Sequence, residues 1–483
     1  MTTTRLSALD AAFLAVETPT AHMHVGWAAV YDPPADGPRP GFEKLRDHIA
    51  SRLPRAPRYR QLLRPVPLGI NAPVWTDDEG FDVSRHIVPA GSERLDEIVA
   101  SCMSKALPRD RPLWQMVLAP QLEDGRIGLV GKAHHCMVDG IAAVELTSLL
   151  LDPDPEPPPP EDDEWTPEPA PGAVGLLADG VVDAARGALR AATLPGRVAR
   201  SPRRVIDLAT RGARAARALA GSSRPARPTR ALNRPNSPMR QLGLLSRPVD
   251  DLRRVKDEFG TKLNDVILAA SAGAVRRFLQ GRGETPIALK TMVPVNVRDP
   301  GDAAGLGNRI SFMFVDLPCE EPDPERRLRR IHAETSERKR AGEPEGADDV
   351  VKSIGWMPTP LQAAVSRFVS SPRVFNLAVS NIPRPRDRLY MRGCELREAY
   401  PVVPLADGHA LSIGVTNVGD RLCFGMYADR ASLPDADTVA RDMEESIDEL
   451  VALSEERRRA GHADRIAFAH GPRDRVRASG TGA

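Results

Sequence analysis

The sequence predicts an α/β protein built from two similar domains that are joined by a long connection. The chain has 483 residues, and a domain typically takes about 100–200, so more than one domain is expected. Helix-like and strand-like patterns alternate before residue 152 and again after residue 240. Between these positions the composition changes abruptly to proline, acidic residues and then arginine, which is typical of a connection and not of a folded core.

These changes in composition divide the chain. We expect an N-terminal domain, a connection, a C-terminal domain and a disordered tail, at residues 1–151, 152–240, 241–454 and 455–483. The connection opens with an acidic, proline-rich segment that ends near residue 171 and should be exposed and extended. It continues as an arginine-rich segment with many alanines and leucines at 174–220, where Pro195 and Pro202 should separate short helices.

Local patterns predict the elements of each domain. In the N-terminal domain Ser7 is in position to cap a short helix. Apolar spacing then predicts strands and helices, with strands at 24–31, 114–118 and 127–135 and helices at 42–53 and 95–107. The last two strands are joined by Glu-Asp-Gly, a good hairpin turn. In the C-terminal domain we expect a buried helix, four strands and an amphipathic helix, at 266–279, 287–297, 310–317, 374–379, 410–418 and 438–453.

Charge, hydropathy and cysteine content exclude several classes of protein. Basic and acidic side chains nearly balance, at 66 against 65, so nothing favours nucleic acid as a partner. The longest largely apolar stretch, residues 266–275, is about half the roughly 20 residues that a membrane span needs. The first residues lack the basic-then-apolar order of a secretory signal, so we expect a cytoplasmic location. The five cysteines are scattered, which predicts neither a disulfide framework nor a CxxC metal site.

The most informative segment is Gly-Lys-Ala-His-His-Cys-Met-Val-Asp-Gly at residues 131–140, where a strand gives way to a helix. Adjacent residues of a strand point to opposite faces, so His134 and His135 should not share a metal ion and only one can face a cleft. Asp139 stands where a carboxylate caps a helix or orients a neighbouring charge, and Gly140 permits a tight bend. A positioned imidazole is the commonest general base; the alternative is a plain strand-turn-helix junction. No cysteine or carboxylate stands at ligand spacing nearby, so no metal site is expected.

The string His-His-x-x-x-Asp-Gly resembles the active-site motif of the CoA-dependent acyltransferase superfamily, which includes chloramphenicol acetyltransferase, carnitine acyltransferases and peptide-synthetase condensation domains. Further motifs in order along the chain make it similar to the bacterial wax ester synthase/diacylglycerol acyltransferase family. They lie at residues 6–13 with 23–26, 111–114, 263–268, 293–298, 307–308 and 379–383. Two places depart from the family's pattern: Arg384 stands where glycine is usual, and Thr416-Asn417 where Ser-Tyr is usual. These departures concern substrate selectivity more than reaction type.

The resemblance implies two chloramphenicol-acetyltransferase-like domains, each a mixed β-sheet flanked by helices, with an active-site tunnel at their interface. It implies that His135 takes the proton from an acceptor hydroxyl as this hydroxyl attacks the acyl-CoA thioester, without an acyl-enzyme. The absence of a Gly-x-Ser-x-Gly nucleophile elbow from the sequence agrees with this. His134 would support the turn, and Asp139 would hold the loop geometry, with Arg298 as a candidate partner.

By the same resemblance, six residues are candidates for substrate binding: Gly140, Trp114, Asn264, Asp265, Ser380 and Asn381. Simpler interpretations stand beside several of them. Trp114 on a strand is more often a core residue. Asn264 could be a helix N-cap before Val266, and Ser380-Asn381 suits an ordinary turn.

The resemblance further implies acyl transfer from long-chain acyl-CoA, a co-substrate, to diacylglycerol, giving triacylglycerol, or to a fatty alcohol, giving a wax ester; no cofactor is expected. The alternatives are an enzyme that uses carrier-protein thioesters and a non-catalytic lipid-droplet coat protein. The arginine-rich segment could dock on anionic lipid or be a solvated crossover balanced by the acidic segment. We expect a cytoplasmic protein that contacts the inner face of the membrane or lipid droplets peripherally, without a nucleic-acid partner.

Overall fold

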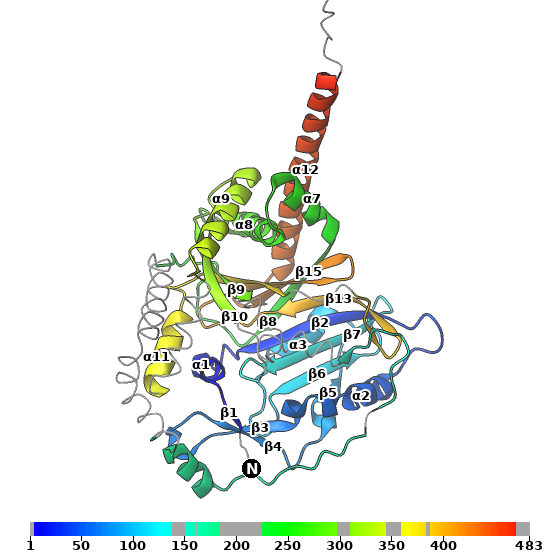
Figure 1. The fold of residues 1–483 in the computed structure, drawn as a ribbon, viewed down its shortest axis with the longest axis vertical. Coiled ribbons are helices and arrows are strands. Elements are labelled where there is room, and N and C mark those ends of the chain that lie inside the picture. The colour runs from blue at the N-terminus through cyan, green and yellow to red at the C-terminus, as the bar shows by residue number, and fades with distance from the viewer. Residues whose placement is uncertain are drawn as a thin grey trace, which may run out of the picture.

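The computed structural model describes residues 4–137, 150–160, 162–182, 185, 225–296, 310–343, 359–382 and 387–469. This part of the chain forms two six-stranded sheets that lie against each other, and a three-stranded sheet near the N-terminus (Figure 1). Each large sheet combines parallel and antiparallel pairs. The expected fold class, two mixed sheets with flanking helices, is confirmed.

The N-terminal sheet has the strand order β12-β13-β2-β7-β6-β5. Its strands are β2 (His24–Asp32), β5 (Ile87–Pro89), β6 (Trp114–Ala119), β7 (Ile127–His134), β12 (Tyr390–Met391) and β13 (Cys394–Val402). Successive side chains of a strand point to opposite faces. One face therefore packs on α2 (Phe42–Ala50), and the other packs on α3 (Leu95–Met103) and on the second sheet. Because β2 and β6 flank β7, the end of β7 lies in the middle of this sheet.

The small sheet and the first helix lie beside the N-terminal sheet. The small sheet consists of β1 (Thr4–Arg5), β4 (Val74–Asp77) and β3 (Gln61–Arg64) in that order. Helix α1 (Ala8–Val16) begins as predicted, with the Ser7 hydroxyl accepting a hydrogen bond from the Asp10 backbone at 3.1 Å. It packs beside α11 (Thr359–Val369), whose Arg367 Nε donates to the Ala15 carbonyl oxygen at 3.0 Å.

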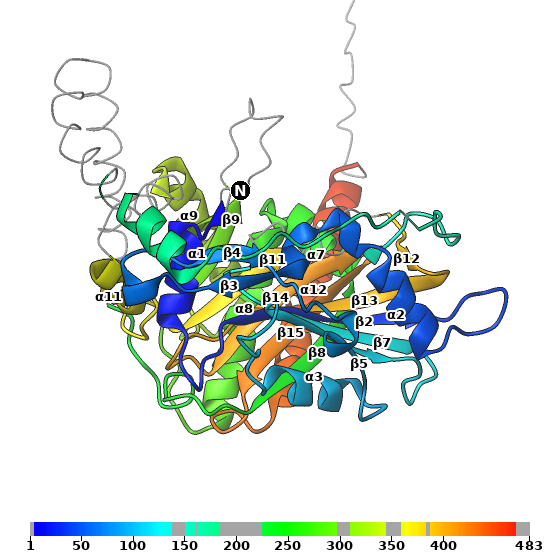
Figure 2. The same cartoon turned by 90° about the horizontal axis from the view of Figure 1, so that it is seen from below.

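The C-terminal sheet has the order β10-β9-β11-β14-β15-β8. Its strands are β8 (Arg240–Pro248), β9 (Leu289–Asn296), β10 (Ile310–Leu317), β11 (Leu377–Ile382), β14 (Leu411–Val418) and β15 (Arg421–Asp429). Figure 1 shows its helices on the side away from the N-terminal sheet, and Figure 2 shows the strands from below. They are α7 (Val249–Phe259), α8 (Leu263–Gly281), α9 (Pro324–Arg340) and α12 (Ala436–Ala469). The apolar middle of α8 is fully buried, as its sequence predicted.

Two strands cross from one half of the chain to the other. β12 and β13 follow residue 389 in the sequence, yet β13 pairs with β2 and extends the N-terminal sheet. The ranges 1–151 and 241–454 therefore do not coincide with the two sheets. The crossing requires close backbone approach, because a Cβ atom at Gly425 would overlap the Pro401 carbonyl oxygen of β13, and one at Gly414 would crowd the same residue.

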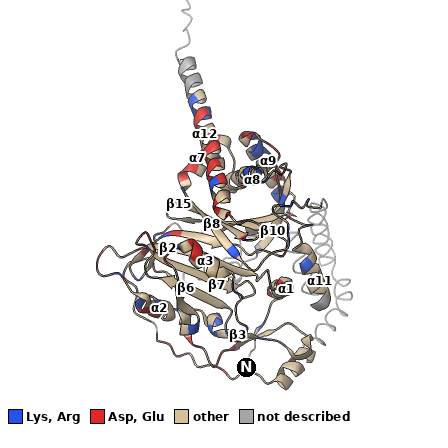
Figure 3. Ribbon diagram, turned by 180° about the vertical axis from the view of Figure 1, so that it is seen from behind, with Lys and Arg blue, Asp and Glu red and all other residues tan. Residues whose placement is uncertain are grey.

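The chain departs from the sequence-based expectation at its C-terminal end. Helix α12 continues to Ala469, so the prediction of disorder from residue 455 is wrong for residues 455–469. Charged side chains of both signs follow the helix outward (Figure 3). Arg457 lies 3.4 Å from the Glu325 carboxylate and 5.4 Å from the Phe259 ring centroid, and Arg459 pairs with Glu455 one turn earlier. Such pairs lengthen a helix whose composition alone suggests a tail.

The acidic segment is mostly exposed and without regular structure, as expected, but two of its carboxylates are anchored. Asp152 is buried and accepts a hydrogen bond from Arg52 Nη2 at 2.8 Å. Asp163 accepts one from Arg60 Nη1 at 2.8 Å. The segment is therefore bound to arginines of the N-terminal half. A helix covers residues 173–182, whereas Pro195, Pro202 and most of the arginine-rich segment lie outside the described residues.

Candidate active site

The two adjacent histidines lie where β7 ends and a turn begins. His134 is the last residue of β7, and its backbone N–H donates to the Leu113 carbonyl oxygen at 2.9 Å. The backbone N–H of His135 donates to the Met23 carbonyl oxygen at 3.0 Å. The backbone N–H of Met137 donates to the His134 carbonyl oxygen at 2.9 Å. The turn is thus held from both neighbouring chain segments.

His135 stacks on Phe13 of α1, with ring centroids 3.7 Å apart and an interplanar angle of 18°. The side chain is half-buried, and its Nδ1 atom is buried without a hydrogen-bond partner. Burial lowers the pKa of His135 to about 4 because a charged imidazole loses its hydration there. The ring is therefore neutral at pH 7 and able to accept a proton.

His134 faces the interior and has a different set of contacts. Its Nδ1 accepts a hydrogen bond from the Cys136 backbone N–H at 3.1 Å, and its Nε2 lies 3.7 Å from the Glu17 carboxylate. Burial lowers the pKa of His134, against the opposing effect of Glu17. Glu17 in turn pairs with Arg109. These contacts tie the His134 ring to the turn and to the end of α1.

Three further buried polar residues surround this histidine pair, and sequence reasoning assigned none of them a role. His24 lies opposite His134 on β2, and both of its ring nitrogens are buried without a partner. Burial holds the pKa of His24 well below its usual range, and that of His22 below it as well. Lys132 Nζ donates to the carbonyl oxygens of Cys102 and Lys105 at 2.6 Å each. The signal that could have found the two histidines is the alternation His22-x-His24 at the start of a strand next to β7.

Several predicted site residues lie outside the described residues: Asp139, Gly140, Arg298 and Arg384.

Trp114 lies within the described residues, and it is a core residue. It is 2% exposed, its Nε1 donates to the Tyr59 carbonyl oxygen at 2.8 Å, and its ring stacks on His86. The simpler interpretation of Trp114 is the one that these contacts favour.

The Asn-Asp pair lies at the start of α8. Asp265 is buried, and its carboxylate lies 2.7 Å from His332 Nδ1 and 2.8 Å from the Thr335 hydroxyl of α9. It also accepts a hydrogen bond from the Lys262 backbone at 3.0 Å. Asp265 therefore joins α8 to α9. Lys262 is the N-cap of α8, so the interpretation of Asn264 as the N-cap is wrong.

The remaining candidates lie in the C-terminal sheet. Ser380 and Asn381 belong to β11, opposite Gly414 and Val415 of β14, so they are strand residues and the expected turn is absent at this point of the described chain. Ser380 is buried. Of the two departures at 416–417, the Thr416 hydroxyl donates to the Ile382 carbonyl oxygen at 2.7 Å and ties β14 to β11.

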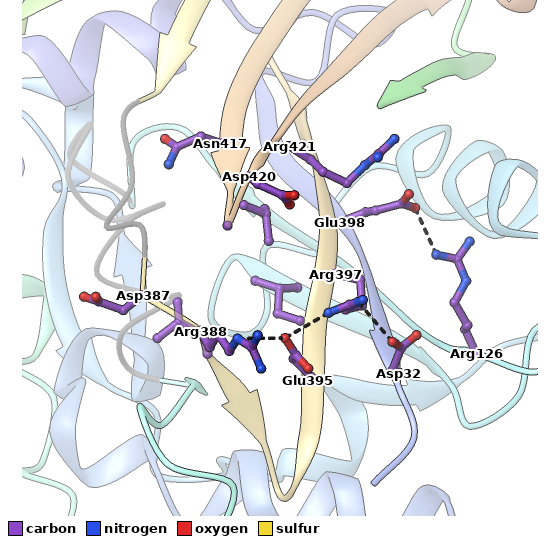
Figure 4. A pocket seen from close by; sticks show the side chains of 14 residues that line it. Asp32, Arg126, Asp387, Arg388, Glu395, Arg397, Glu398, Asn417, Asp420 and Arg421 are labelled. Atoms are coloured by element: carbon purple, nitrogen blue, oxygen red, sulfur yellow. Dashed lines mark hydrogen bonds and ion pairs between the residues drawn. The ribbon is translucent and has the colours of Figure 1, made fainter. Parts of the chain in front are cut away.

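Asn417, the second departure, lines a polar groove of about 780 Å³ where β12 and β13 meet the β14–β15 turn (Figure 4). Its charged lining residues comprise arginines and carboxylates in nearly equal number: Arg126, Arg388, Arg397, Arg421, Asp32, Asp387, Glu395, Glu398 and Asp420. Arg126 pairs with Glu398 at 3.2 Å, and Arg397 pairs with Asp32 and Glu395 at 3.0 Å each. The pairs of Arg126 with Glu398 and of Arg397 with Asp32 fasten β13 to the N-terminal half. The groove is too polar to hold an acyl chain.

Within the described residues no helix combines the length and apolar character needed to cross a membrane. No group of three or more histidine, cysteine, aspartate or glutamate side chains within the same ranges is arranged to hold a metal ion.

Comparison with known proteins places these features in a family. Residues 6–267 match the model of the wax ester synthase/diacylglycerol acyltransferase catalytic domain, and residues 306–451 match the C-terminal domain of that family. The Mycobacterium tuberculosis (strain H37Rv) protein named "Probable diacyglycerol O-acyltransferase tgs1" is 31% identical over 465 residues, which cover 94% of this chain and 97% of that protein.

Solved structures show the same fold. The wax ester synthase/diacylglycerol acyltransferase from Marinobacter aquaeolei VT8 matches with a TM-score of 0.67 at 24% identity, over 94% of this chain and 100% of that one. The starter condensation domain of rhizomide synthetase, solved with C8-CoA, matches with a TM-score of 0.57 at 14% identity, over 94% and 95% of the two chains. With its two matched domains and its histidine turn, the chain belongs to the wax ester synthase/diacylglycerol acyltransferase family.

Proposed function

We propose that this chain transfers a long-chain acyl group from acyl-CoA to the hydroxyl of diacylglycerol, which gives triacylglycerol, and that fatty alcohols serve as a second acceptor. Acyl transfer is the activity of the family to which the chain belongs. The observation that carries the proposal is His135, a neutral imidazole at the end of a central strand, held by Phe13 and by a turn. No cofactor is needed for this reaction.

The reaction follows from a neutral base beside an activated ester. His135 takes the proton of the acceptor hydroxyl while the hydroxyl oxygen attacks the thioester carbonyl carbon. The tetrahedral intermediate then collapses: the carbon–sulfur bond breaks, the new ester is released, and the CoA thiolate receives the proton from His135. The thioester is already activated, so a covalent acyl-enzyme is unnecessary.

One assay tests the proposal. The purified full chain is given radiolabelled palmitoyl-CoA with diacylglycerol or with hexadecanol, and in a parallel reaction a palmitoyl carrier protein replaces palmitoyl-CoA. We expect labelled triacylglycerol from palmitoyl-CoA, and labelled wax ester in the hexadecanol reaction. Product from the carrier protein alone would replace the proposal with the condensation-type alternative. No product from any donor would favour a non-catalytic coat protein.

We also propose that the protein is cytoplasmic and contacts the membrane or lipid droplets peripherally. An apolar surface supports this part of the proposal. Leu68, at the tip before β4, is 87% exposed, and Val174 in the helix at 173–182 is 83% exposed. The opposite side of that helix packs inward, with Leu176 buried and Gly180 against Val66. Exposed aliphatic side chains at the point where the arginine-rich segment begins suit insertion into a lipid surface.

A further inference from the structure

Helix α1 brings two side chains to the histidine pair from outside the sheet. Phe13 stacks on His135, and Glu17, the C-cap residue of α1, faces His134. The helix is itself held in place by Ser7 at its start and by α11 along its side (Figure 1). The end of this helix therefore lies beside the turn that carries both histidines.

The hydrogen bond from Cys136 indicates which ring nitrogen of His134 carries the hydrogen. Because the Cys136 N–H donates to Nδ1 at 3.1 Å, Nδ1 must present a lone pair and not a hydrogen. A neutral ring then carries its hydrogen on Nε2. Nε2 is buried, lies 3.7 Å from the Glu17 carboxylate oxygen and has no hydrogen-bond partner within normal distance. At 3.7 Å the Glu17 carboxylate lies just beyond hydrogen-bond distance of this N–H.

The charge of Glu17 is maintained by its neighbours. Burial by itself would raise the pKa of Glu17, but His134 and Arg109 outweigh burial and hold that pKa below its usual value. The carboxylate is thus ionised at neutral pH. Arg109, which pairs with Glu17, belongs to the segment just before β6. A part of the chain remote from α1 therefore helps to fix the position of the Glu17 carboxylate. Distances of this kind commonly shorten when substrate binds.

We propose that Glu17, held by Arg109, is a positioning residue for acyl transfer: acting together with the Cys136 N–H, it stabilises the Nε2–H tautomer of His134 and so supports the turn that orients His135. The inference rests on the proposed function, since the turn matters for catalysis only if His135 is the base. If His134 instead carried its hydrogen on Nδ1, that hydrogen would oppose the Cys136 N–H and remove this hydrogen bond from the turn.

The test combines kinetics with a direct reading of the tautomer. Glu17→Ala should lower kcat by about 10–100-fold, the range typical when a partner that orients a functional histidine is removed. KM for palmitoyl-CoA and the melting temperature should stay unchanged, because the turn keeps its backbone hydrogen bonds and the Glu17 side chain is 23% exposed. Glu17→Gln, whose amide oxygen can still accept a hydrogen bond, should recover part of the loss. Asp110→Asn, an exposed carboxylate beside Arg109 that pairs with Arg111, is the matched control and should keep wild-type kcat.

Histidine labelled with ¹⁵N reports the tautomer in the full chain, and a His134→Gln variant assigns its signals. The wild-type protein should show His134 as the Nε2–H form, and Glu17→Ala should show a mixture or the Nδ1–H form. An unchanged tautomer in Glu17→Ala overturns the inference, whether or not activity falls. A lower melting temperature in both Glu17 variants, with no change of the His134 tautomer, would make Glu17 a structural residue. This result would also overturn the inference. A wild-type protein without acyltransferase activity would refute the proposed function separately, while the tautomer measurement would still decide whether Glu17 fixes His134.

Discussion

His135 combines two properties that a general base needs at neutral pH. It lies at the end of a central strand with its backbone held by Met23, and burial against Phe13 keeps its ring unprotonated. Strand geometry predicted that the two adjacent histidines have different surroundings. It could not predict Phe13 or Glu17 as partners, because those contacts come from a helix more than a hundred positions earlier in the chain.

The lowered pKa of His135 predicts the pH dependence of the reaction. The base must be neutral to work, and its pKa is about 4, so kcat/KM should be level between pH 6 and 8 and should fall only as the pH approaches about 4. The measurement is kcat/KM across this range, with circular dichroism at each pH to confirm that the protein is folded. A profile that falls with an apparent pKa near the ordinary histidine value, about 6.5, would show that the base is less buried or is another group.

Strong local periodicity made most individual elements predictable, and long-range pairing set their arrangement. β2, β6, β7 and α8 form where their apolar spacing indicated. The crossing of β13 into the N-terminal sheet depends on which strand edge it meets, and no local pattern encodes that choice. The continuation of α12 depends on Arg457 reaching α7 and α9, so composition alone gave the wrong answer there.

The joint between α8 and α9 yields a prediction for Asp265. Removing its carboxylate in Asp265→Ala leaves His332 and Thr335 without their acceptor, and the loss of such buried hydrogen bonds typically costs about 1–3 kcal/mol in the free energy of unfolding. Urea unfolding should show this loss, while turnover per folded molecule stays near wild type. Asp250→Ala, an exposed carboxylate at the start of α7, is the control and should unfold like wild type. A stable but inactive Asp265 variant would instead make Asp265 part of the substrate site.

The protein carries many neutral, buried histidines, and this has a consequence for its stability. Burial lowers the pKa of His22, His24, His48, His86, His134, His135 and His409. The unfolded chain binds protons at the ordinary histidine pKa, whereas the folded chain does so only at lower pH. The free energy of unfolding should therefore fall as the pH drops below about 6.5. Urea titrations at pH 7.5, 6 and 5 measure it, and equal midpoints at all three values would contradict the burial of these rings.

Lipid binding should have an apolar and an electrostatic part. Replacing Leu68 and Val174 with serine removes two exposed aliphatic side chains, so vesicle co-sedimentation should weaken at every salt concentration. Replacing Arg203, Arg204, Arg211 and Arg214 with glutamine should weaken binding to anionic vesicles only, and mainly at low salt. Met239→Ser, at another exposed apolar position, is the control and should bind like wild type. Vesicle binding that is absent in the wild-type protein, or unaffected by both sets of changes, would refute peripheral attachment through this region.

The fold class, the family and the histidine turn could all be predicted from the sequence, because they depend on composition, periodicity and a spaced motif. The assignment of substrate-facing residues could not. Trp114 and Asp265 occur in motifs, yet their side chains are committed to buried contacts within the protein. A motif specifies the residue type at a position. The folded structure is needed to show whether that residue serves the reaction or the packing of the protein.

The measurement that decides the account is the turnover of His135→Ala with palmitoyl-CoA and diacylglycerol, beside its melting temperature. Loss of a general base typically lowers kcat by about 10²–10⁴, and the fold should remain intact because the turn is held through backbone hydrogen bonds. His332→Ala removes a histidine from α9 and is the control, with wild-type turnover expected once the protein is folded. A folded His135→Ala protein that keeps more than about a tenth of wild-type turnover would contradict the role of His135 as the base.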